Sequence, residues 1–358
     1  MNRRILTALL LCFISAIPAL AQIDKASIEV VAMDSSKTPL PGVTVTVARP
    51  ETGFQTVGVT DAGGIAIFNA LTPGNYTVAL SLEGFAAPAA QAVVLRVGQH
   101  QKLSVAMQQA ASETITITAD VPVVDVHKTD SSTNIVPEQI QGLPVLNRDF
   151  EKLALLTPGV QRERGSFRFI NGGPVVGAGG NASQTTIFVD GVDMTDQVNG
   201  LSRARFSQDA VSEFRVIANR FDTEIGGSAG GALSIITRSG TNDMHGSVFG
   251  FFRDAALREQ GALDLVKNDD YSRRQLGFTV GGPLRRDQLF YFASLEQINE
   301  KDITLFRPSG AYAARAADFG KPFDQTLLFG SATMNINPEM NAGLRVVYEN
   351  FDQENFRV

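Results

Sequence analysis

The sequence predicts a mainly β protein, with an N-terminal β-sandwich, a central α+β domain and about five antiparallel strands of an incomplete β-barrel. Three observations predict this class. Short apolar runs alternate with turns that contain Pro and Gly through the first part of the chain. A glycine-dense turn near the middle leads into a run that is typical of a buried strand. The final part consists of longer strands in which apolar and polar residues alternate.

The composition excludes several classes of protein. The chain has 358 residues, a net charge of −6, one cysteine and no tryptophan. This mild, mixed charge predicts no nucleic-acid partner, because phosphate binding needs clustered Lys and Arg. The three histidines have no metal-ligand spacing. No Ser, His and Asp constellation can be placed either, so we expect no metal site, no cofactor and no enzyme.

Residues 1–21 are expected to be a cleavable export signal. A positively charged start and an apolar stretch precede Ala19-Leu20-Ala21, which has the small-x-small cleavage pattern, and Gln22 follows. The alternative, a transmembrane anchor, needs a longer apolar run to span about 30 Å. Cleavage between Ala21 and Gln22 would remove Cys12, so the mature chain would use no thiol or disulfide chemistry.

Residues 22–109 are expected to form the sandwich. Their short strand-like runs are separated by turn signals such as Pro41-Gly42 and Pro73-Gly74, at the spacing of a sandwich. The order PLPGVTVTV, ETGFQTVGVTDAGG and FNALTPGNYTVALSLEGF resembles a carboxypeptidase regulatory-like domain, which implies a prealbumin-type fold without catalysis. Some relatives of this sandwich bind carbohydrate, but no exposed aromatic stripe indicates that function here.

The strongest motifs lie in residues 129–240. A strand ends on the turn pair Asp190-Gly191, and residues 211–218 alternate as a half-buried strand does. The glycine-dense turn that follows permits left-handed backbone and close approach of neighbouring chains. A phosphate cradle is the alternative, but no helix of the required spacing follows. We also expect Asn147 to cap a helix through Leu156.

These motifs resemble the plug domain of TonB-dependent outer-membrane transporters of the Oar-like group. VDGV, VSEFRV, GGSAGGALSIIT and SGTNDMHGS occur in that family's order, and SSTNIVPEQIQGLPVLNRDFEKLALLTPGV matches the start of its plug. Met244 departs from the pattern, because an aromatic residue is expected before His245. The plug-motif residues are Val189, Asp190, Gly191, Gly226, Gly227, Gly230 and Gly231.

Residues 110–128 are expected to be a linker, in which Thr and Ile alternate just ahead of the plug. An extended segment of this kind can add a strand to the sheet edge of another protein. By position and pattern it resembles a TonB box, the peptide bound by the periplasmic protein TonB. A last strand of the sandwich and an ordinary linker are the alternatives. The box-like residues are Glu113, Thr114, Ile115, Thr116, Ile117, Thr118 and Ala119.

Residues 241–358 are expected to be barrel wall. Leu276, Phe278 and Val280 share one strand face, which predicts an apolar surface toward outer-membrane lipid and a polar interior. A soluble sheet gives the same alternation, but here long polar links alternate with tight turns, as in outer-membrane proteins. The family resemblance continues through GSVFGFFRDAAL. Plugged transporters close with about 22 strands, so about five predict an incomplete transporter.

The resemblance implies a TonB-dependent receptor in the cell outer membrane, with its N-terminal domain in the periplasm. Such a receptor would actively take up a ligand through a plug gated by the box peptide. The sequence does not identify this ligand, for which a carbohydrate and a peptide are the candidates. The alternative is a surface binding or adhesion protein that has a barrel anchor and no active transport. That protein would not need the linker peptide.

Overall fold

The computed structural model describes residues 24–109, 131–143, 145–162, 174–177, 184–196, 201–203, 205–218, 225–257, 259, 269–337 and 340–354. The expected signal cleavage site (Ala21, Gln22) and the TonB-box-like residues 113–119 lie outside these ranges. Within them, no helix is both long enough and apolar enough to cross a membrane.

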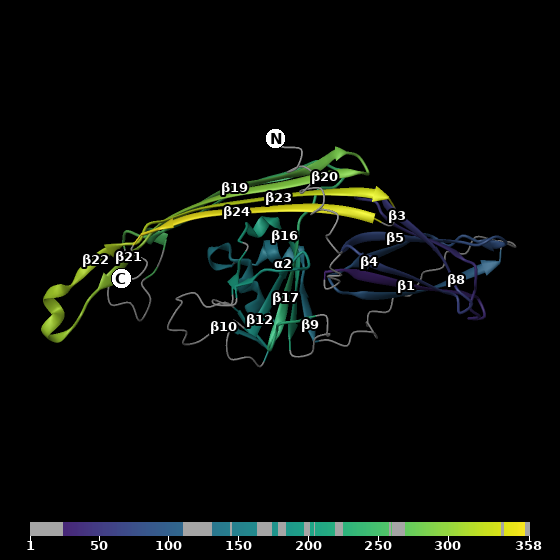
Figure 1. Ribbon diagram of the computed structural model, residues 1–358, viewed down its shortest axis with the longest axis horizontal. Helices are drawn as coiled ribbons and strands as arrows, with labels where there is room; N and C mark the ends of the chain where they lie inside the picture. Colours follow the sequence, from purple (N-terminus) through teal and green to yellow (C-terminus); the bar gives the residue numbers. More distant parts are fainter. Residues whose placement is uncertain are drawn as a thin grey trace, which may run out of the picture.

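The N-terminal unit is a sandwich of two four-stranded sheets, with strand orders β3-β2-β5-β7 and β4-β1-β8-β6 (Figure 1). Apolar side chains on alternate strand positions meet between the sheets, and Ile28, Val45, Val78 and Leu103 are fully buried there. The strands are β1 (Ala26–Asp34), β2 (Thr44–Arg49), β3 (Phe54–Val59), β4 (Ile65–Leu71), β5 (Gly74–Ser81), β6 (Phe85–Ala86), β7 (Gln91–Leu95) and β8 (His100–Gln109).

Strand β3 was not predicted from the sequence. Gly58 weakens its strand signal, because glycine has no side chain to pack. In the structure this glycine makes room for a neighbour, since a Cβ at Gly58 would lie 3.0 Å from the ring of Phe68. The sandwich thus places a glycine where an aromatic ring approaches the backbone.

We expect residues 22–108 to fold alone, because the described strands of this segment form two complete sheets around their own core. Circular dichroism of the isolated segment should show β structure and one cooperative melt. EDTA should leave that melt unchanged, since the mature segment has no cysteine. A random-coil spectrum would contradict the prediction.

The second unit, expected from the sequence to be the plug, is built on a five-stranded sheet of order β13-β12-β17-β16-β9. Strands β12 and β17 pair in parallel, and the other neighbours pair antiparallel. The sheet and its neighbouring elements are β9 (Ser132–Ile135), α2 (Pro137–Gly142), η1 (Leu146–Arg148), η2 (Phe150–Leu156), β10 (Val160–Arg162), β11 (Pro174–Val176), β12 (Thr185–Val189), β13 (Val192–Asp193), β14 (Thr195–Asp196), β15 (Leu201–Ser202), η4 (Gln208–Ala210), β16 (Val211–Ala218) and β17 (Gly231–Thr237).

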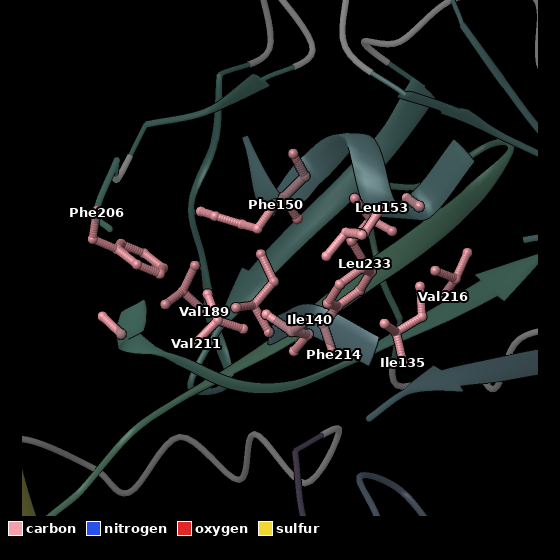
Figure 2. Packing of buried hydrophobic residues seen from close by; sticks show 14 of the residues in the cluster. Ile135, Ile140, Phe150, Leu153, Val189, Phe206, Val211, Phe214, Val216 and Leu233 are labelled. Atoms are coloured by element: carbon pink, nitrogen blue, oxygen red, sulfur yellow. The ribbon is translucent and has the colours of Figure 1, made fainter. Parts of the chain in front are cut away.

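The plug core lies between this sheet and the short helices. Ile140 from α2 and Leu153 from η2 pack against Phe214 and Leu233 of the central strands (Figure 2). Every residue of β17 is buried, as its apolar sequence predicts for a central strand.

Two local predictions about the plug were wrong. Strand β16 is not half-buried: most of its residues are buried, including Glu213, because it lies between β17 and β9 and is covered on both faces. Asn147 does not cap a helix. It lies inside η1 with a φ of 64°, which Asn tolerates better than most residues. Asp149 is the cap, and its carboxylate accepts a hydrogen bond from the backbone N–H of Glu151.

The third unit is an antiparallel sheet of order β18-β19-β20-β23-β24, which arches over the plug (Figure 1). The hairpin β21–β22 lies within residues 301–325, one of the links that were expected to be long and polar, and at the opposite end of the molecule from the sandwich. The five strands are an open sheet with β18 and β24 at its edges. The elements are β18 (His245–Asp254), η5 (Ala255–Leu257), β19 (Ser272–Arg285), β20 (Leu289–Lys301), β21 (Ile303–Phe306), η6 (Gly310–Arg315), β22 (Ala317–Gly320), β23 (Phe323–Asn337) and β24 (Met340–Gln353).

The two faces of the arching sheet differ as the alternation predicted, with one exception. Leu276, Phe278 and Leu344 are exposed on the outer face, whereas the intervening Gln275 and Thr279 are buried. The exception is a set of inward-facing phenylalanines, which the prediction of a polar interior missed. The rings of Phe292 and Phe329 pack into the apolar core of the plug rather than facing water. Phe290, which shares the strand face of Phe292, is buried as well.

Candidate functional site: the plug and its contacts with the barrel wall

The predicted turn after β12 connects the plug to the barrel wall. Asp190 and Gly191 have φ values of 48° and 82°, which suit a tight turn into β13. The Asp190 carboxylate accepts hydrogen bonds from the backbone N–H and the hydroxyl of Thr237. Its Oδ2 also lies 3.2 Å from Nε of Arg345 on wall strand β24. The turn therefore holds the end of β17 and a wall strand together, while its neighbour Val189 lies in the plug core.

The glycine-dense segment folds closely around the carbonyl group of Gln184. Gly227 has a φ of 74°, and the N–H groups of Ala229 and Gly230 both donate to the carbonyl of Gln184 at 3.1 Å. The hydroxyl of Ser228 accepts from the N–H of Gly231 at 2.9 Å. These donors already bind Gln184 and Ser228, so the segment offers no support for a phosphate cradle.

Gly231 and Gly226 differ sharply in their surroundings. A Cβ at Gly231 would lie 2.4 Å from the carbonyl oxygen of Ile217 and 2.5 Å from Cγ1 of Val176. At Gly226 a Cβ would meet nothing within 4 Å. Gly231 is thus required for the close approach of β16 and β17, whereas Gly226 is not.

We therefore expect Gly231→Ala to destabilise the plug by about 1–3 kcal/mol, the usual cost of forcing extra volume into a packed site. Gly226→Ala, the matched control, should change stability by less than about 0.5 kcal/mol. Hydrogen exchange of the amides in β16 and β17, followed in detergent micelles, measures both. Equal effects of the two substitutions would contradict the steric explanation.

A charged seam that the sequence did not predict joins η1 to the wall. The guanidinium of Arg148 pairs with Asp209 of the plug, and its Nε lies 4.0 Å from Glu296 of β20. The same guanidinium lies over the rings of Phe249 and Phe251 of β18, 4.8 and 4.3 Å from their centroids. No motif marks Arg148, because these partners come from distant parts of the chain.

Two buried carboxyl groups belong to the plug. Burial raises the pKa of Glu151 to about 7, and the neighbouring Asp149 acts in the same direction. Burial also raises the pKa of Glu213, although Asn134 donates a hydrogen bond to it. Among the described residues, no group of three or more His, Cys, Asp or Glu side chains could hold a metal ion. Each of these two carboxyl groups is therefore a separate buried acid and depends on hydrogen-bond donors next to it.

Comparison with known proteins gives two domain models and curated relatives. A family model described as an outer membrane beta barrel domain matches residues 236–353, and a carboxypeptidase regulatory-like domain model matches residues 27–108. The TonB-dependent transporter Oar of Myxococcus xanthus is 32% identical over 275 residues, which cover 72% of this chain and 25% of that protein. The chain is a homologue of TonB-dependent outer-membrane transporters. The resemblance to the Oar-like group is thereby confirmed.

Other similar proteins have related descriptions. A probable TonB-dependent siderophore receptor, PirA of Acinetobacter baumannii, is 26% identical over 230 residues, covering 56% of this chain and 27% of that protein. The crystal structure of PirA aligns with 62% of this chain and 32% of its own, at 19% identity and a TM-score of 0.45. A ferric enterobactin receptor variant of Pseudomonas aeruginosa, in complex with enterobactin, aligns over 63% and 34%, at 18% identity and a TM-score of 0.46.

This transporter homologue spans about a quarter of the length of the curated relatives it matches. The predicted mainly β class and the outer-membrane location are confirmed by the two domain models and the Oar relative. The relatives are described as transporters and receptors. The domain boundaries and the roles of the plug-motif and box-like residues stay predictions.

Proposed function

We propose that the protein is a TonB-dependent outer-membrane receptor for active uptake, with a periplasmic sandwich and a plug gated through residues 113–119. The observation that carries this proposal is the position of β9. This strand is the first described element after the linker and lies at the edge of the plug sheet. A pull on the linker would therefore act first on a strand with one neighbour in that sheet.

Strand β9 is also short enough to be peeled away. It pairs with β16 from Ile135↔Phe214 to Ser132↔Ile217, and a hydrogen bond contributes about 1 kcal/mol net to stability. Only this short ladder holds β9 in the sheet, so we infer that a pull on the linker would open it before the other strand pairs of the plug. Strand β16 would stay in place, because β17 pairs with it on its other side.

The ligand class is open within this proposal. The sequence left carbohydrate and peptide as candidates, and the description of PirA adds siderophores. The hairpin β21–β22 lies at the opposite end of the molecule from the sandwich (Figure 1). With the sandwich in the periplasm, this hairpin would face the outside, where a ligand first arrives.

Cysteine cross-linking tests the gating part of the proposal. The mature chain is expected to have no cysteine, so single cysteines introduced from Glu113 to Ala119 would be unique. Paired with a cysteine on the periplasmic domain of TonB from the same organism, alternate positions should cross-link, as in an added strand. A cysteine at His127 serves as the control outside the box. Absence of cross-links at every box position would favour the surface-binding alternative.

A further inference from the structure

The turn between β7 and β8 of the sandwich contacts the plug at the strand that follows the linker. The backbone N–H of Val97 donates to Oε1 of Glu213 on β16 at 3.2 Å. The amide of Asn134 on β9 donates both to this Oε1, at 2.9 Å, and to the carbonyl oxygen of Val97, at 3.2 Å. Asn134 therefore joins β9, β16 and the sandwich in one set of hydrogen bonds, which we call the plug contact. Figure 1 shows β9 on the side of the plug that faces the sandwich.

Charge and shape both support the plug contact. Glu213 is only 4% exposed, and the guanidinium of Arg96 approaches its Oε2 to 3.9 Å from the sandwich side. Gly98 has a φ of 62°, and a Cβ there would lie 1.4 Å from Nη1 of Arg215. The turn is thus shaped so that the side chain of Arg215 on β16 can lie against Gly98.

A second part of the sandwich contacts the barrel wall, and we call it the rim contact. The backbone N–H of Asn242 donates to the carbonyl oxygen of Glu51 at 2.7 Å, and Nδ2 of Asn335 donates to that of Thr52 at 3.1 Å. The same two asparagines bond Asp287 in the turn between β19 and β20. The sandwich is therefore held by residues that also organise this end of the wall.

We propose that the sandwich is a brace between the barrel wall and the plug. Fixed to the wall by the rim contact, it holds β9 on β16 through the plug contact. Strand β9 is released only after the plug contact opens. Both contacts lie at the end of the sandwich where Gly74 pairs with Leu95 and Asn75 bonds Glu51, next to one continuous core, so loosening either contact should free β9. This brace is a property of the resting chain and does not require that transport occurs.

Hydrogen–deuterium exchange of the full chain in detergent micelles tests the plug contact. Arg96→Glu places a carboxylate beside Glu213 without changing the plug sequence. We expect the amides of β9 to exchange at least about tenfold faster, because the variant loses an ion pair and adds a like charge beside a buried carboxylate. Lys102→Glu is the matched control, because Lys102 pairs with Glu29 on the sandwich itself. Unchanged exchange of β9 in Arg96→Glu, or equal acceleration by the control, would overturn the proposal.

A second variant breaks the plug contact directly, and a third separates a brace from a local contact. Asn134→Asp is isosteric, removes the donor to Val97 and adds a charge beside Glu213, so it should accelerate exchange in β9 while leaving β17 protected. Asn335→Ala touches neither β9 nor the plug contact. A brace predicts faster exchange of β9 in Asn335→Ala as well, since the sandwich would lose a wall anchor. Wild-type exchange of β9 in that variant would overturn the brace, whatever the other variants show.

Discussion

In a version with a complete barrel, replacing Ile117 with proline is expected to abolish TonB-energised uptake and leave ligand binding intact. Proline has no N–H to donate to an inter-chain ladder, and its ring fixes φ near −65°, away from the extended strand. The lost hydrogen bond and the misfit together should weaken TonB binding by at least about tenfold. Accumulation of ligand by cells, compared with binding to the same cells without energy, measures the two effects separately.

Ile117→Val is the matched control for this substitution. Valine keeps the backbone donor and the β-branched side chain that suits an extended strand, so uptake should stay close to that of the unsubstituted protein. If Ile117→Pro also took up ligand at the normal rate, box-dependent gating would be excluded. The surface-binding alternative would then be preferred.

The long elements were predictable from sequence because their patterns are local. The alternation through Leu276, Phe278 and Val280 depends only on the period of a strand, and β19 follows it. The run 232–237 has the apolar composition of a central strand, and β17 is buried throughout. The turn pair Asp190-Gly191 needs a positive φ at both positions, which its residue types permit.

The contacts between units were not predictable, because they join distant parts of the chain. Arg148 is unremarkable in sequence, yet it meets Glu296 because wall strand β20 lies over the plug. Glu213 was read as one polar position of a half-buried strand. It is buried because Asn134 and the sandwich turn cover it, and no local period encodes that.

The inward-facing phenylalanines of the wall were not predictable from the sequence either. Replacing one of them should have a large effect on the stability of the plug. The polar-in rule assumes that the wall faces water. Here the ring of Phe329 lies 5.7 Å from that of Phe206 in the plug and 6.1 Å from that of Phe292 in the wall, centroid to centroid. The plug is therefore held partly by apolar packing against the wall, in addition to the Asp190–Arg345 contact.

We expect Phe329→Ala to loosen the plug while leaving the wall intact. Phe329 is 1% exposed, and truncating a buried phenylalanine to alanine costs about 3–5 kcal/mol. The backbone pairs of β23 with β20 and β24 do not involve the ring, so the loss should appear in the plug. Exchange of the amides in β16 and β17 should accelerate by more than about a hundredfold.

Leu328→Ala is the matched control on the same strand. Leu328 is 41% exposed and faces outward, so its truncation should leave exchange in the plug unchanged. Phe329→Leu, which keeps most of the apolar volume, should fall between the two. If Phe329→Ala accelerated exchange in β23 and β24 as much as in the plug, the ring would be supporting the wall itself. If all three variants behaved alike, apolar packing against the wall would contribute nothing to the stability of the plug. The polar contacts alone would then hold the plug against the wall.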